Sequence, residues 1–165
     1  MKSFPHPSSA SPSSQRGITL LIALIFLLML SMLGIWGATN NTLQERMAGN
    51  SRNRDLAFEA AEAALDYAEN TLTTWRTGGF DGTNGLLAYD VTRANDATYW
   101  RNTANWASYR QVPVGNLNQV AEQPRYIVEK MNPIGSVEYY RITARGVGGD
   151  SNAVAILQTI VTYTP

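Results

Sequence analysis

Apolar residues fill an unbroken stretch near the start of the chain. Residues 18–38 read ITLLIALIFLLMLSMLGIWGA, and only Thr19 and Ser31 carry a hydroxyl group. As a helix these 21 residues extend about 32 Å, which is enough to cross the hydrocarbon core of a bilayer. Hydroxyl side chains can bond back to helix carbonyls, so they do not oppose this assignment. We predict a transmembrane helix over residues 18–40.

A helical pattern continues beyond the apolar stretch. Residues 41–76 contain no proline, and Gly49 is their only glycine. From residue 58 onward, apolar residues recur at spacings of three and four, which places them on one stripe of a helix. The stripe consists of Phe58, Ala61, Leu65, Ala68, Leu72 and Trp75. We predict that residues 41–76 form the amphipathic outer half of one long helix, packed through this stripe on a globular partner.

Four carboxylates lie opposite this stripe, at Glu59, Glu62, Asp66 and Glu69. Paired acids can serve in glycoside hydrolysis or in metal binding. On an alanine-rich helix, spacings of three and four are more typical of a face exposed to solvent. We interpret the four residues as a solvated face.

The composition changes over residues 77–123, which are rich in glycine, asparagine and threonine. We predict an irregular, variable connection here, since glycines end the helix. Residues 81–85, DGTNG, resemble part of a calcium loop but lack the spacing of an EF-hand, which favours a plain turn. Tyr99, Trp100, Trp106 and Tyr109 could bind a sugar, but packing over a small sheet is the simpler interpretation.

Three stretches near the C-terminus have the composition of β-strands. Residues 125–131, 138–145 and 153–163 are rich in isoleucine, valine, tyrosine and threonine, and turn sequences separate them. Short loops favour an antiparallel meander over residues 124–165. In the middle strand Tyr140, Ile142 and Ala144 alternate with Arg141, Thr143 and Arg145. We expect the first set to cover the helix, and the second to meet solvent or a neighbour. The predicted fold class is therefore α+β, a long helix on a small antiparallel sheet.

Composition excludes several classes of function. Lysine plus arginine and aspartate plus glutamate both number 13, and this balance argues against binding of nucleic acid. The chain has no cysteine and one histidine, His6, which excludes thiol catalysis, cysteine-bound zinc and histidine-pair metal sites. We predict no catalytic residues, no cofactor and no metal site, so an enzyme is not expected.

Residues 1–17 form a serine- and proline-rich segment that contains Lys2 and Arg16. Positive charge before an apolar span predicts that this end stays in the cytoplasm and that the later residues lie beyond the inner membrane. The alternative is a cleaved secretory signal peptide. That alternative fits poorly, because an apolar core of ~7–15 residues would be expected.

The sequence where residues 1–17 meet the apolar stretch resembles that of a known family. Arg16-Gly17 is followed directly by Ile18-Thr19-Leu20. Together with the long helix and small sheet, this junction resembles that of type IV pilin and pseudopilin precursors, whose leader ends in glycine. The resemblance implies that a membrane peptidase cuts between Gly17 and Ile18, and that Ile18 is then N-methylated.

Further stretches are similar to minor pilins of the PilX type. They are TLQERMAGN at 42–50, RDLAFEAAEAAL at 54–65, YRITARGVGG at 140–149 and VAILQ at 154–158. The resemblance implies a minor pilin that primes pilus assembly and supports adhesion and twitching motility. The implied partners are other minor pilins, the major pilin, the prepilin peptidase and methylase, and the inner-membrane assembly platform. The implied location is the inner membrane, in a single pass, and then the cell-surface pilus.

The chain departs from the pilin pattern in two ways. The fifth residue after the implied cut is Ile22, where most pilins carry a glutamate. The resemblance implies that such a glutamate neutralises the N-terminal amine of the subunit above, so a subunit with isoleucine belongs at or near the pilus tip. The cysteine pair found near the C-terminus of many pilins is also missing.

Two alternatives remain open from the sequence. One is a pseudopilin of a type II secretion system, and the other is a single-pass periplasmic sensor or binding protein that never polymerises. Cleavage after Gly17 separates the second from a pilin, because an ordinary membrane anchor would keep its leader.

Overall fold

A long N-terminal helix dominates the computed structural model, which describes residues 16–94, 96–113 and 117–165. Helix α1 covers Arg16–Asn70, and the short helix α2, Leu72–Trp75, follows it after a break at Thr71. The predicted leader lies outside the described residues, except for its last two positions. The chain divides into two units, of which the second is Ala48–Pro165. Since α1 runs through this division, its inner and outer parts are treated separately below.

The second unit contains a five-stranded sheet. Its strands are β1, Leu86–Ala88; β2, Arg110–Gln111; β3, Arg125–Lys130; β4, Glu138–Val147; and β5, Val154–Tyr163. The strand order is β1-β3-β4-β5, and β2 pairs with β3. The last three strands lie within about two residues of the predicted ranges and form the expected antiparallel meander.

The sheet is mixed, so the prediction of a purely antiparallel sheet was wrong. Strand β1 runs parallel to β3, with Leu86 opposite Val128. A parallel pair requires a long crossover, and residues 89–124 supply one. The segment expected to be irregular therefore contributes two strands to the sheet. At two and three residues, these strands are too short for an alternating pattern to appear in the sequence.

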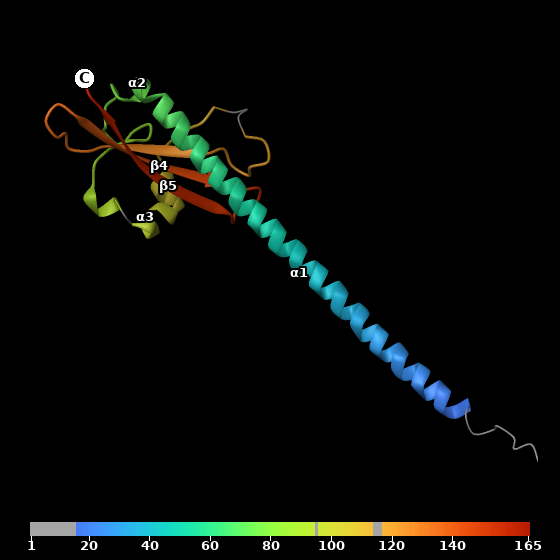
Figure 1. Ribbon diagram of the computed structural model, residues 1–165. Helices are drawn as coiled ribbons and strands as arrows, with labels where there is room; N and C mark the ends of the chain where they lie inside the picture. The colour runs from blue at the N-terminus through green and yellow to red at the C-terminus, as the bar shows by residue number, and fades with distance from the viewer. Residues whose placement is uncertain (1–15, 95, 114–116) are drawn as a thin grey trace, which may run out of the picture. The chain divides into compact units, whose positions relative to one another are not determined.

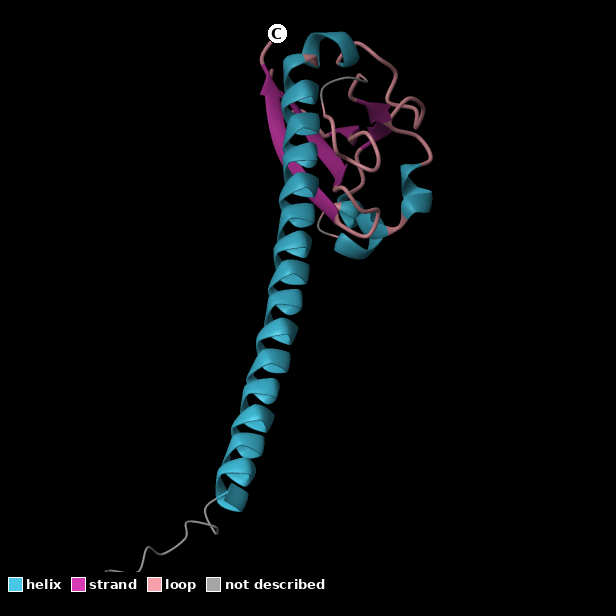
Figure 2. Ribbon diagram, turned by 90° about the vertical axis from the view of Figure 1, so that its right-hand side faces the viewer, coloured by secondary structure: helices cyan, strands magenta, loops and turns pink. Residues whose placement is uncertain are grey.

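The outer part of α1 lies across one face of this sheet (Figure 2). A core between them contains Trp75 of α2 together with Tyr126, Val128, Tyr140, Ile142 and Ala144 of the sheet. The predicted inward set of the middle strand, Tyr140, Ile142 and Ala144, thus faces the helix, as expected. On α1 the fully buried positions are all alanines: Ala57, Ala60, Ala61, Ala64 and Ala68.

The opposite face of the sheet is also covered. Short helices lie over it (Figure 1): η1, Val91–Arg93; α3, Ala97–Arg101; and η2, Thr103–Trp106. Trp100 and Trp106 pack with Ile127 in a second core, which confirms that these aromatics serve packing. The indole nitrogen of Trp106 donates to the carbonyl of Trp100 at 2.8 Å.

The expectation that Arg141, Thr143 and Arg145 face solvent or a neighbour was therefore wrong, since all three are buried. The physical reason is an ion pair from a neighbouring strand. The Nε of Arg141 donates to Glu129 at 2.7 Å, and Glu129 itself is fully buried. Arg93 of η1 lies 3.1 Å from the same carboxylate and ties the covering segment to the sheet.

Burial raises the pKa of the Glu129 carboxyl, while the hydrogen bond and charge of Arg141 and the charge of Arg93 oppose that rise. A buried carboxylate without such partners would be costly, so the two guanidiniums explain why polar residues can occupy this face.

Candidate functional site

The inner part of α1 exposes apolar side chains on all sides. Fifteen large hydrophobic residues between Ile18 and Trp36 are exposed, and none of the most apolar window is buried within the chain. A helix that is apolar all round requires a non-aqueous environment, either lipid or neighbouring apolar helices. This is the one helix among the described residues that could span a membrane.

Polar groups inside this segment are bonded within the helix. The hydroxyl of Ser31 donates to the carbonyl of Leu27 at 2.8 Å. Such back-bonding satisfies a hydroxyl in the absence of water. Residues 17–44 carry no formal charge, so nothing in the sequence opposes burial of the segment in lipid.

The implied cleavage site lies in the first turn of α1, which begins at Arg16. The first four N–H groups of any helix lack a partner within it, so this turn is the part most easily opened. Ile18 is 65% exposed, and a side chain at Gly17 would meet no atom within 4 Å. No residue that the structure describes therefore covers either side of the Gly17–Ile18 bond.

Ile22 lies one turn further along α1 and is 47% exposed. Its side chain is surrounded on the helix surface by apolar residues, including Ile18 and Phe26 at positions four away. The position therefore offers no carboxylate to a neighbouring chain.

Only some residues of the predicted packing stripe pack against the core. Ala61, Ala68 and Trp75 are buried, and Leu65 and Leu72 are half-buried against the same core. Phe58, by contrast, is 46% exposed, because the contact face is centred on alanines rather than on the large side chains.

Two glycines at the end of β4, Gly146 within the strand and Gly148 just beyond it, explain this shift. A Cβ at Gly146 would fall on the carbonyl oxygen of Ala57 and the amide nitrogen of Ala61, and one at Gly148 would fall on the carbonyl of Asn53. The helix and strand backbones approach too closely for larger residues. Sequence reasoning missed these two glycines, although the pattern Gly-x-Gly at the end of a strand, opposite a row of alanines, was a usable signal.

The four carboxylates opposite the stripe are all exposed, at Glu59, Glu62, Asp66 and Glu69. Among the residues that the structure describes, no three histidine, aspartate or glutamate side chains are grouped to hold a metal ion. Asp81, at the start of the DGTNG sequence, accepts from the amide of Thr83 at 3.0 Å and from its hydroxyl at 2.7 Å. These bonds lower the pKa of Asp81. Both are made within the turn itself, as is usual for an aspartate that begins a turn.

A polar cluster fixes the end of the meander. Glu138 lies 2.9 Å from the ammonium of Lys130 and 3.2 Å from the guanidinium of Arg76, and it accepts the hydroxyl of Tyr140 at 2.7 Å. The Tyr140 hydrogen bond, followed by that of Lys130, lowers the pKa of Glu138 to about 2. This cluster joins the end of the long helix region to β3 and β4, and it touches no described part of the apolar segment.

Two family models match the chain. Residues 16–66 match the model described as PilX N-terminal, and residues 58–163 match the model described as type IV pilus assembly protein PilX C-term. Comparison with curated proteins and with solved structures gave no match. The two matched ranges overlap on the outer part of α1, so together they include the apolar segment, the alanine face and all five strands.

Proposed function

This chain belongs to the PilX family of type IV pilus assembly proteins, and we propose that it is a minor pilin that primes pilus assembly at the tip. In this proposal the apolar part of α1 anchors the chain in the inner membrane before assembly and packs among other pilin helices afterwards. The globular unit then stands on the fibre surface and supports adhesion and twitching motility.

The observation that carries the tip position is Ile22. An N-terminal amine placed among apolar helices costs several kcal/mol unless a carboxylate pairs with it. Most pilins carry a glutamate at this position. A chain with isoleucine receives a glutamate from below but offers none to a subunit above it. Such a chain fits best where no subunit lies above, which is the end of the fibre that forms first.

Processing is the first step of this function. We propose that the prepilin peptidase cuts between Gly17 and Ile18 and that the Ile18 amine is then methylated. The exposed first turn of α1 supports this step, because a peptidase must open the chain locally to bind it. Lys2 and Arg16 keep the leader on the cytoplasmic side, where it is removed.

The implied partners follow from this route. They are the major pilin, other minor pilins and the inner-membrane assembly platform. The family description favours a pilus over a type II secretion system. A periplasmic sensor that never polymerises would require no leader cleavage at Gly17, so processing separates it from a pilin.

The experiment is N-terminal sequencing and intact-mass measurement of the protein taken from sheared surface fibres, with the Gly17→Val variant in parallel. The expected wild-type product begins at N-methylated Ile18. A β-branched side chain would clash in a tight peptidase site that the bare backbone of glycine can enter, so Gly17→Val should leave the full-length chain in the membrane. An identical trimmed N-terminus in both, or absence of the wild-type chain from fibres, would contradict the proposal. Ala23→Val is the matched control, since it adds the same bulk beyond the cut.

A further inference from the structure

Strand β5 is a long edge strand without the usual protection. Among the described strands it pairs with β4 alone, and Figure 2 shows it at the outer side of the sheet. Its sequence, VAILQTIVTY, contains no charge, proline or glycine. Edge strands of monomeric proteins are normally shortened, charged or interrupted by proline, because their open N–H and C=O groups attract other strands. An unprotected edge of ten residues is therefore suited to receive a partner.

Two hydrogen bonds establish which residues face the open edge. Met131 N donates to Tyr139 O at 2.9 Å, so Tyr139 points its backbone toward β3. Gly148 N donates to Ala153 O at 2.8 Å, so Ala153 points toward β4. Backbone direction alternates along an antiparallel strand. The residues of β5 whose N–H and C=O groups point outward are therefore Val154, Ile156, Gln158, Ile160 and Thr162.

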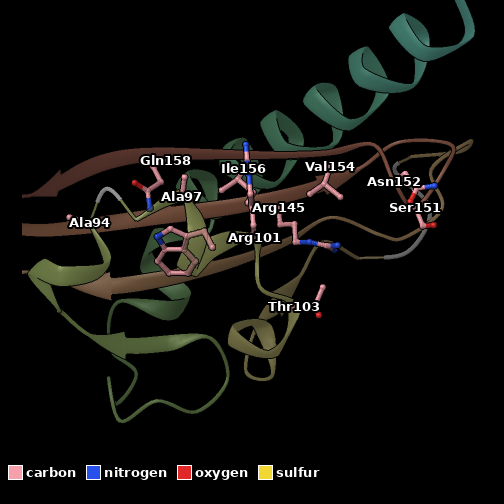
Figure 3. Close-up of a pocket in the computed structure, with 11 residues that line it drawn as sticks. Ala94, Ala97, Arg101, Thr103, Arg145, Ser151, Asn152, Val154, Ile156 and Gln158 are labelled. Carbon is pink, nitrogen blue, oxygen red and sulfur yellow. The ribbon is translucent and has the colours of Figure 1, made fainter.

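A groove runs beside this edge, on the face away from α1. One part has a volume of about 720 Å³ and lies between β5 residues such as Ile156 and α3 residues such as Ala97 (Figure 3). A second part of about 290 Å³ shares Ala94 and Gln158 with it and continues toward Ile160. Apart from Thr159, the residues of β5 that line the groove belong to the outward-facing set. A strand added at the edge would place alternate side chains next to this groove.

The charge in the groove has one sign. Arg101, Arg141 and Arg145 line its two parts, and no described carboxylate does. Arg141 is matched by Glu129. At the other end, Arg145 shares the single carboxylate of Glu122 with Arg125, at 3.0 and 3.1 Å.

Arg101 adds a further, exposed positive charge to that end. Two further carboxylates lie outside the lining: Asp150, on the turn between β4 and β5, accepts from Asn152, and Asp96 accepts from amides in the first turn of α3. Among the described residues that line the groove, every charged group is a guanidinium, so a partner with negative charge would complement them.

We propose that the free edge of β5 binds an extended segment of a partner protein, which adds one strand to the sheet. The segment carries apolar residues at alternate positions, beside the groove, and a carboxylate next to Arg101 and Arg145. Strand addition of this kind derives affinity from backbone hydrogen bonds and specificity from alternate side chains. It does not depend on the position of the chain in a fibre.

The test uses the full chain in cells, with a photo-crosslinking phenylalanine analogue in place of Thr162, an exposed outward-facing position. Fragment masses of the crosslinked product identify the segment that lies beside β5. Ile160→Pro removes one outward N–H group, a change that edge strands tolerate. Ile160→Thr is the matched control, because it also removes the isoleucine side chain but keeps the N–H. Arg101→Glu and Arg101→Lys form a second pair that changes only an exposed side chain.

The expected result is a crosslink to a single segment of a different protein, with an alternating apolar pattern and an acidic residue. Ile160→Pro and Arg101→Glu should each lower its yield about tenfold, while both control variants retain it within about twofold. Equal yields for Ile160→Pro and Ile160→Thr would overturn strand addition. A crosslink to a second copy of this chain, or to no protein, would overturn the proposed occupant. An unchanged yield for Arg101→Glu would overturn the negative charge proposed for the partner segment. If Ile160→Pro fails to accumulate, the sequence of the crosslinked segment still tests the occupant and its alternating pattern, and the Arg101 pair still tests the charge.

Discussion

At the scale of single residues, the close approach of β4 to α1 depends on the absence of a side chain. Gly146 allows β4 to approach the α1 backbone at Ala57 and Ala61. The cost of adding a methyl group here cannot be relieved by a rotamer change, because backbone atoms lie on the other side.

We therefore predict that Gly146→Ala lowers the free energy of unfolding by about 2 kcal/mol, near the middle of the range for overpacked cores. Urea unfolding of the full chain in detergent, followed by tryptophan fluorescence, measures this change. Gly79→Ala is the control, since a Cβ there meets only Asp81 side-chain atoms at ordinary contact distance. Equal stability of the two variants would show that the helix and sheet do not depend on this close approach.

A second residue-scale prediction concerns pH. The pKa of Glu138 is lowered to about 2, mainly by the hydrogen bonds of Tyr140 and Lys130. In the unfolded chain the same carboxyl titrates near its ordinary value, so the folded state binds fewer protons between the two values. Its contribution to stability is therefore complete above about pH 5 and is lost as the pH falls toward 2.

Glu138→Gln should be less stable than the wild type at pH 7, and the difference should shrink as the pH is lowered to about 2.5. Thermal unfolding of both chains across this range provides the measurement. Glu62→Gln, on the exposed face of α1, should follow the wild-type curve. A constant gap between Glu138→Gln and wild type at all pH values would refute the role of ionised Glu138.

At the scale of elements, the periodic patterns of the sequence were most informative where one element packs through one face. Spacings of three and four predicted the outer part of the long helix, and strand-type composition between turn sequences predicted β3, β4 and β5. The alternating pattern gave the wrong exposure where a second layer of the chain covers the sheet. Nothing local indicates that Arg141 is buried, because its partner Glu129 lies on another strand and its cover comes from residues 77–123. Phe58 was misplaced because the spacing of large residues was given more weight than the alanines beside them.

A prediction at the scale of elements concerns residues 34–42, where the apolar segment of α1 meets the rest of the helix. Gly34 and Gly37 lie within the helix, where each glycine costs ~1 kcal/mol relative to alanine. Segment 34–42 should therefore open locally more often than segment 57–68, which is held by the sheet. A Cβ at either glycine meets no atom within 4 Å, so alanine fits both positions.

Replacing both by alanine should slow amide exchange over 34–42 by about tenfold or more, measured on the full chain in detergent. Gly49→Ala, at another α1 glycine whose Cβ would meet no atom within 4 Å, should slow exchange only around its own position. Wild-type exchange over 34–42 that is already as slow as over 57–68 would count against a weak junction.

At the scale of the whole molecule, the family match gives a type IV pilus assembly protein, and the apolar segment gives it a helix long and apolar enough to span a membrane. The sequence predicted the fold class, the apolar segment and the family. Its limits were the mixed sheet and the second layer, both of which depend on contacts between residues far apart in the chain. The proposed position in the fibre depends on one side chain, Ile22, and this makes the position testable by a single substitution.

The most direct measurement is the location of labelled copies of the protein along single pili, seen by electron microscopy, for wild type, Ile22→Glu and Ile22→Gln. The account predicts wild-type and Ile22→Gln label at one end only. It predicts Ile22→Glu label along the shaft as well, because the new carboxylate can pair with the amine of a subunit above. Uniform labelling of the wild-type shaft, or normal numbers of pili in a strain that lacks the protein, would contradict the assignment to the tip.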